Sequence, residues 1–300
     1  LDQVRAVGWG VLPVLLVFAL AYLVDTVSWS YTLPRPLTAA WIRRLWVVRI
    51  VGGAISKVTP LLGLGGEPVK AMMLKRHDGI PYRMTASSLI AWETTNMLGS
   101  VVFAGSGLLA AMALDLLPPE SRGPAIAGLA VLVVAAVGFL AFQRLRGFSR
   151  LLRPVSRWVG GRRLLRMLRH LRDIEEQLRA FYAGGGGRMR RVFLLSLVHQ
   201  ALLAFEVWLT MRFLGTPVTA VGAWAITAVA EIIRVGTFFI PANLGTQEGG
   251  LTLIATALTG NPTAGLSLAI IRRFRDLIFI LWGLWLGWRD GVTAGEGPRS

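Results

Sequence analysis

Charged residues interrupt the long apolar segments of this 300-residue chain. Ionisable groups inside a membrane are costly, commonly paired and often functional. They are Arg49, Lys57, Glu67, Glu93, Glu206, Glu231, Arg234, Glu248, Arg272, Arg273, Arg275 and Asp276. Helical spacing permits two ion pairs, Glu231 with Arg234 at i,i+3 and Arg272 with Asp276 at i,i+4. Both pairs can also be read as purely structural.

Glu67 and Glu248 stand at equivalent places in two helix-breaking sequences. Each lies seven residues after a proline, Pro60 or Pro241, in a Gly-rich gap of an apolar segment. We expect each glutamate to open a short helix, where the helix dipole favours a carboxylate. Helix capping alone accounts for that position, whereas a functional reading requires the two tips to meet and form one site.

Such a site would bind charged groups of both signs. Carboxylates bind an ammonium group, and guanidinium groups hold a phosphate. Neutral amides add further donors and acceptors. This chemistry suits a zwitterionic or cationic phospholipid headgroup. The residues expected to bind substrate are Arg49, Glu67, Lys70, Glu93, Arg234, Asn243, Gln247, Glu248, Arg272 and Arg273.

The elements that position these residues are helices, and the fold class expected is an all-α polytopic membrane protein. A spanning helix needs about 20 mostly apolar residues. The five segments that meet this length are Val7 to Trp29, Met84 to Leu114, Pro124 to Phe142, Val192 to Leu214 and Ala264 to Trp288. Two further segments, Leu45 to Thr59 and Val218 to Ile240, run into the proline breaks. Each predicts a re-entrant hairpin of two half-helices, because broken backbone at membrane depth must be covered.

The order helix, hairpin, helix occurs twice and predicts an inverted-topology repeat within one membrane domain. Such repeats with broken helices are typical of transporters. The basic loops place the C-terminus in the cytoplasm by the positive-inside rule. The predicted division is 1–143 for the first repeat half with an added helix, 144–191 for a basic cytoplasmic linker, 192–290 for the second half and 291–300 for a tail.

Composition favours a membrane over nucleic acid, although the net charge is +16. Hydrophobic residues make up 54% of the chain and charged residues 16%, against about 25% charged in soluble domains. The chain has no cysteine, and neither metal-ligand nor nucleotide-binding spacing is found. We therefore expect no cofactor, no metal and no enzymatic activity.

The segment from Arg144 to Arg191 holds 14 of the 32 basic residues. Within it, Arg162 to Tyr182 has apolar residues at helical spacing and predicts a basic amphipathic helix. Such a helix suits the anionic inner leaflet. The alternative is a solvated cytoplasmic loop that only fixes topology.

The two broken segments resemble the signatures of a known family. "TPLLGLGGEPVKAMML" (Thr59 to Leu74), "FFIPANLGTQEGGLTLI" and "IRRFRDL" look like those of the flippase-like membrane region of lysyl-phosphatidylglycerol synthases. Stand-alone members include hopanoid-biosynthesis-associated membrane proteins. The resemblance implies a bacterial or archaeal cytoplasmic-membrane protein that handles lipids. It supports as site residues Glu67, Lys70, Asn243, Gln247, Glu248, Arg272 and Arg273.

The chain departs from the family pattern at both ends. Residue 1 is Leu, and we expect that one helix of the pattern precedes it. No aminoacyl-transferase domain follows Trp288, so we expect that the chain does not synthesise the lipid.

The leading hypothesis is a flippase-like transporter that moves a phospholipid or lipid-linked headgroup between leaflets. The alternatives are a transporter of a small soluble anion or amino acid, an enzyme acting on polyprenyl or hopanoid lipids, and a membrane scaffold. Expected partners are membrane lipids, a lipid-modifying enzyme and a second copy of the chain.

Overall fold

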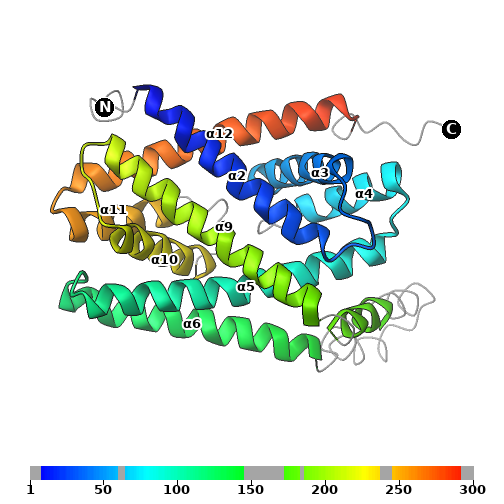
Figure 1. Cartoon of the computed structure of the whole chain (residues 1–300), viewed down its shortest axis with the longest axis horizontal. Helices are drawn as coiled ribbons and strands as arrows, with labels where there is room; N and C mark the ends of the chain where they lie inside the picture. The colour runs from blue at the N-terminus through cyan, green and yellow to red at the C-terminus, as the bar shows by residue number, and fades with distance from the viewer. Residues whose placement is uncertain (1–7, 60–64, 145–171, 183–185, 237–244, 292–300) are drawn as a thin grey trace.

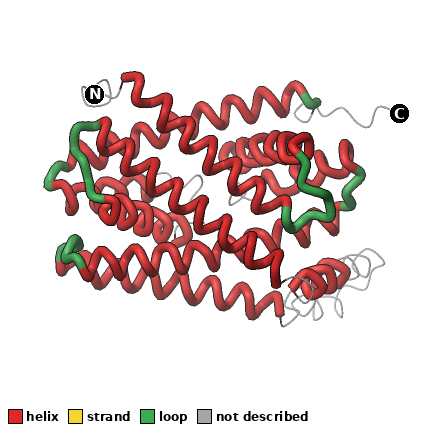
Figure 2. The backbone as a smooth tube through the Cα atoms, viewed as in Figure 1, coloured by secondary structure: helices red, strands yellow, loops and turns green. Residues whose placement is uncertain are grey.

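The structure, a computed structural model, describes residues 8–59, 65–144, 172–182, 186–236 and 245–291. Helices are the regular secondary structure found in these ranges, in agreement with the predicted all-α class (Figure 2). The helices are η1 (Gly8–Gly10), α2 (Val11–Ser30), α3 (Ala39–Val58), α4 (Gly66–Asp78), α5 (Tyr82–Ala113), α6 (Pro119–Arg144), a short helix at 172–182, α9 (Gly186–Phe213), α10 (Ala220–Gly236), α11 (Thr246–Thr259) and α12 (Pro262–Arg289).

Four of these helices are long and apolar enough to cross a membrane. They cover Gly8–Ser30, Tyr82–Ala113, Arg122–Gln143 and Gly186–Phe213. The fifth predicted span, α12, has 28 residues and a length of about 42 Å, but four charged side chains lie in its middle. The chain is therefore a multi-pass membrane protein, and five full spans stay a prediction.

The first broken segment consists of α3 and α4. The sequence predicts that its first half begins at Leu45, which is wrong, because α3 begins at Ala39. The side chain of Thr38 accepts a hydrogen bond from the Trp41 N–H at 3.2 Å and so starts the helix six residues earlier. A Cβ atom on Gly66 would lie 1.8 Å from the carbonyl oxygen of Gly52. Only glycine permits this close approach of α4 to α3.

The second broken segment consists of α10 and α11. The predicted break after Ile240 falls at 237–244, outside the described residues. Gly245, at φ 81°, precedes α11, and Gly260, at φ 68°, ends it. Both backbone conformations are left-handed and favour glycine. As predicted, Glu67 and Glu248 each lie in the first turn of the second half-helix.

The contacts between helices in the first half of the chain correspond to contacts in the second half. α2 lies along α9 across the middle of the bundle (Figure 1). α3 packs on α12, as α10 packs on α5. Within each broken segment the halves contact each other, α3 with α4 and α10 with α11. Each broken segment is therefore held between helices from both halves of the chain.

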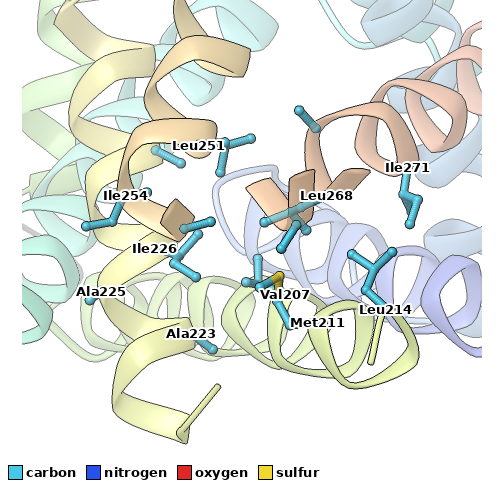
Figure 3. Packing of buried hydrophobic residues seen from close by; sticks show 14 of the residues in the cluster. Val207, Met211, Leu214, Ala223, Ala225, Ile226, Leu251, Ile254, Leu268 and Ile271 are labelled. Atoms are coloured by element: carbon cyan, nitrogen blue, oxygen red, sulfur yellow. The ribbon is translucent and has the colours of Figure 1, made fainter. Parts of the chain in front are cut away.

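Apolar side chains fill the bundle and also cover its outside. One core cluster joins α9, α10, α11 and α12 through residues such as Met211, Ile226, Leu251 and Leu268 (Figure 3). The outer surface of α6 exposes large apolar side chains, among them Val134 at 70%. An apolar exterior is the expected surface for contact with lipid tails.

The predicted basic linker is described only in part. Residues 145–171, with most of the predicted amphipathic helix, lie outside the described residues. The remaining helix, 172–182, contacts the start of α5. There the Ser87 hydroxyl donates to the Gln177 side chain at 2.7 Å, and Arg83 pairs with Asp173 at 3.3 Å.

Candidate functional site

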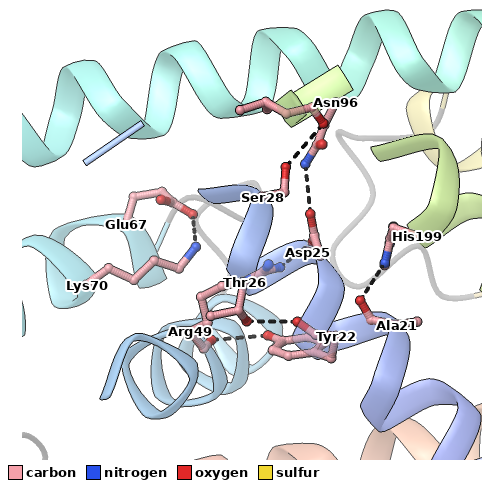
Figure 4. Close-up of polar contacts among 11 residues, drawn as sticks. Ala21, Tyr22, Asp25, Thr26, Ser28, Arg49, Glu67, Lys70, Asn96 and His199 are labelled. Atoms are coloured by element: carbon pink, nitrogen blue, oxygen red, sulfur yellow. Dashed lines mark hydrogen bonds and ion pairs between the residues drawn. The ribbon is translucent and has the colours of Figure 1, made fainter. Parts of the chain in front are cut away.

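A buried ion pair joins the first helix to the first broken segment (Figure 4). Arg49 Nη2 lies 2.6 Å from Asp25 Oδ2, and both residues are buried. The Asn96 amide of α5 donates to the other Asp25 oxygen at 3.2 Å. The Arg49 guanidinium lies 4.6 Å from the ring centre of Tyr22 and 4.7 Å from that of Trp92. These aromatic faces stabilise a cation away from water.

Lys70 and Glu67 form a second pair, within α4. Lys70 Nζ lies 2.7 Å from Glu67 Oε1 and 6.0 Å from the ring centres of both Trp29 and Trp92. Lys70 is buried, and the second Glu67 oxygen is buried with no hydrogen-bond partner among the described residues. Glu67 thus keeps one open acceptor.

The third pair connects the second broken segment to α5. Arg234 Nε and Nη2 contact the two oxygens of Glu231 at 2.9 and 2.6 Å, which confirms the predicted i,i+3 pair. Glu231 also accepts from the Ser100 hydroxyl at 2.6 Å, and Ser100 accepts from Gln200 at 2.8 Å. This buried chain of polar groups joins α10, α5 and α9.

Glu248, at the start of α11, caps its own helix and also pairs with α12. The Gly245 N–H donates to Glu248 Oε2 at 2.9 Å, which caps the helix. The other oxygen pairs with Arg273 Nε of α12. Gln247, Glu248, Arg272 and Arg273 line a cavity of about 20 Å³, which is room for about one water molecule.

The predicted pair of Arg272 with Asp276 is wrong. Asp276 instead contacts Lys57 of α3 at 2.8 Å and its neighbour Arg275 at 2.9 Å. Arg275 also pairs with Glu206 of α9, with an Nη1–Oε1 distance of 2.6 Å. Tertiary partners therefore replace the expected contact within one helix. Nε and Nη1 of Arg272 are left buried without a hydrogen-bond partner in the described ranges.

Charges of the two signs balance in the apolar segments and hairpin tips. We call these side chains the interior charges. The carboxylates are Asp25, Glu67, Glu93, Glu206, Glu231, Glu248 and Asp276, and the cations are Arg49, Lys57, Lys70, Arg234, Arg272, Arg273 and Arg275. Each set has seven members, and six of each form ion pairs. Glu93 and Arg272 are the members without an ion pair in the described part of the chain.

The site is more dispersed than the sequence indicates. Both broken segments pack on α5, and Glu93 of α5 lies within electrostatic range of Arg234 and Lys70. Gln247, Glu248, Arg272 and Arg273 gather separately, around α12. Asn243 lies outside the described residues.

Asp25, Asn96 and Gln200 were not predicted from the sequence. Asp25 pairs with Arg49, Asn96 donates to Asp25, and Gln200 reaches Glu231 through Ser100. A signal for Asp25 was present, because it is the single charged residue of α2. His199 of α9 makes a contact with α2, with its Nδ1 2.9 Å from the Ala21 carbonyl oxygen. No group of His, Asp and Glu with a metal-binding arrangement occurs in the residues that the structure describes.

A family model described as the lysylphosphatidylglycerol synthase TM region matches residues 1–283. No curated protein and no solved structure matches the chain. The family predicted from the two signatures is confirmed, whereas similarity to hopanoid-biosynthesis-associated proteins stays a prediction.

Proposed function

The chain belongs to the family of the lysylphosphatidylglycerol synthase TM region, and we propose that it moves a phospholipid or lipid-linked headgroup between the two leaflets of a membrane. A headgroup passes along the interior charges while its tails stay in the surrounding lipid. The membrane we propose is the bacterial or archaeal cytoplasmic membrane, with the C-terminus in the cytoplasm.

The observation that carries this proposal is the set of buried hydrogen-bonding atoms left without partners. Arg49 Nη1 and two nitrogens of Arg272 lack acceptors, and one Glu67 oxygen lacks a donor, within the described residues. Buried polar atoms are normally satisfied, so these are open to a ligand. Guanidinium nitrogens bind the oxygens of a phosphate, and a carboxylate oxygen binds an ammonium group. A headgroup that carries a phosphate fits this donor set.

The arrangement of the helices supports alternating access. We propose that α2 to α5 and α9 to α12 form two repeats of opposite topology, because their packing pairs correspond. Each broken segment packs on a helix of the other repeat. Rocking of one repeat against the other then changes both contacts together, as in other transporters with inverted repeats.

Three further proposals concern partners. The basic segment 144–191 binds anionic lipids of the inner leaflet. A lipid-modifying enzyme and a second copy of the chain are proposed as protein partners. We also propose that the chain itself performs transport without catalysis.

A test of transport uses purified protein in liposomes that contain fluorescent phosphatidylglycerol or phosphatidylethanolamine. Dithionite bleaches only the outer leaflet, so the bleached fraction reports lipid movement. We expect bleaching beyond one half for the wild type and at least about a tenfold lower rate for Arg272→Gln, because one charge-assisted contact of about 1.4 kcal/mol is lost.

The matched control is Arg212→Gln. Arg212 lies in the last turn of α9, away from the interior charges, and its guanidinium rests over the Trp208 ring at 5.4 Å. It should keep the wild-type rate. Equal rates of lipid movement for Arg272→Gln and the wild type would show that Arg272 does not bind the headgroup. Uptake of a soluble anion without lipid movement would favour the soluble-solute transporter, and a change in lipid mass would favour an enzyme.

A further inference from the structure

Glu93 differs from every other interior carboxylate. The other six each contact a cation directly. Glu93 has no ion pair or hydrogen bond with any residue that the structure describes, and its side chain is exposed. Unpaired carboxylates at membrane depth are rare and mark ion or proton pathways. Glu93 therefore needs a role that its paired neighbours do not share.

The position of Glu93 on α5 places it inside the bundle. It follows Tyr82 by 11 residues, about 16 Å along the helix, close to half the ~30 Å hydrocarbon thickness. Asn96 and Ser100, three and seven residues on, share its face and contact Asp25 and Glu231. The lipid-side residues Val102 and Leu109 lie on the opposite face, 48% and 68% exposed. The exposure of Glu93 is thus toward the polar interior.

Charges from both broken segments lie within electrostatic range of this carboxylate. Arg234 of α10 and Lys70 of α4 act on Glu93 as cations, and Asp25 and Glu67 act on it as anions. Arg49 of α3 also lies within electrostatic range. Lys70 and Arg234 already have partners, Glu67 and Glu231. An ionised Glu93 competes with those partners for both cations, and a protonated Glu93 does not.

We infer that Glu93 is the proton-binding site that couples lipid movement to a proton gradient. The inference deepens the proposed transport function and rests on it for the coupling. Water on the proton-rich side protonates the carboxylate, and the proton leaves to water on the other side after the repeats rock. No covalent bond other than the O–H bond forms or breaks. Protonation also removes the cost of an unpaired charge at membrane depth.

The proton acts on both broken segments at once. Loss of the proton adds a negative charge that attracts Lys70 and Arg234, one from each segment. Gain of the proton returns both cations to Glu67 and Glu231. Each protonation state therefore favours a different distance between α4, α10 and α5, which is the differential interaction that a coupled transporter needs.

The coupling experiment uses liposomes with fluorescent phosphatidylethanolamine, an internal pH dye and an imposed gradient of one pH unit. With one proton per lipid, such a gradient sustains up to about tenfold lipid asymmetry. We expect asymmetry and proton entry together for the wild type. In Glu93→Gln both are lost, and any lipid movement that remains is equal with and without the gradient. Glu120→Gln, in the first turn of α6 and outside the interior charges, serves as the matched control and keeps both.

A second measurement separates this inference from the proposed function. Infrared difference spectra of the purified protein, taken at low and high pH, report protonated carboxylic acids directly. We expect one such signal that Glu93→Gln lacks, while Glu120→Gln retains it. Its absence from the wild type, or its persistence in Glu93→Gln, would overturn the proton site even if lipids move. A signal with no lipid movement would overturn the transport function and leave the proton site standing, without its coupling role. A wild type that moves lipid but builds no asymmetry under the pH gradient would overturn the coupling.

Discussion

Asp25 and Arg49 connect α2 to α3 through side chains that are 7% and 8% exposed. Removal of one partner leaves the other charge buried without compensation, at a cost of about 3–5 kcal/mol. We expect Asp25→Ala to lower the free energy of unfolding by roughly that amount. Thermal or denaturant unfolding of the detergent-purified protein measures it.

Two further variants test the cause. Asp25→Leu combined with Arg49→Met removes both charges and should recover most of the loss, since apolar replacements of buried pairs are often neutral. Asp173→Asn breaks a pair with side chains 40% and 53% exposed and should cost less than about 1 kcal/mol. An equally large loss in Asp173→Asn would contradict an effect of burial.

Sequence spacing predicted local pairs and failed for distant ones. Glu231 and Arg234 are three residues apart in one helix, so their contact follows from helical geometry alone. Asp276 could reach Arg272 by the same rule. However, α3 packs against α12, and Lys57 Nζ of α3 lies 2.8 Å from Asp276 Oδ2. Which helices pack together is not encoded in the spacing of one helix. For the same reason Asp25 was missed, because its partners lie on α3 and α5.

At the scale of elements, the breaks could be predicted because proline and clustered glycine act locally. The second half-helices begin where Glu67 and Glu248 indicate. The start of α3 could not be predicted from the sequence. The charged residues Arg43 and Arg44 were interpreted as part of a loop, whereas Thr38 caps a helix that includes both of them. The number of spans depends on α12. This helix is long enough to cross a membrane, but its four central charged residues make it less apolar than the other spans.

Gly66 tests how closely the halves of the first broken segment must approach. We expect Gly66→Ala to destabilise the protein by about 1–3 kcal/mol, because the new methyl group overlaps the Gly52 carbonyl. Gly249→Ala in α11 meets no atom within 4 Å, and it should be neutral or stabilising by up to about 1 kcal/mol. The difference in melting temperature between the two variants is the measurement. Similar melting temperatures would mean that α4 can move away from α3.

At the scale of the whole molecule, the proposed topology places Glu120 outside the cell and Glu176 in the cytoplasm. Because the chain has no native cysteine, a single introduced cysteine reports its own side. In intact cells we expect an impermeant maleimide to label Glu120→Cys and to label Glu176→Cys only after permeabilisation. Both residues are exposed, so access to the thiol is not limiting. The reverse pattern would invert the whole topology, and labelling of both from one side would contradict an odd number of crossings between them.

The distribution of ion pairs along the chain has a consequence for biosynthesis. Partners in four of the six pairs lie within 25 residues of each other. Glu67 with Lys70 and Glu231 with Arg234 are three residues apart, Asp25 with Arg49 is 24 apart and Glu248 with Arg273 is 25 apart. These charges can enter the lipid already neutralised while the ribosome is still extending the chain. Glu206 must wait for Arg275, 69 residues later in the chain, and an unpaired charge costs about 2.5–3.5 kcal/mol to insert. We expect α12 to leave the translocon last and to enter the bilayer only where the earlier helices already offer it partners.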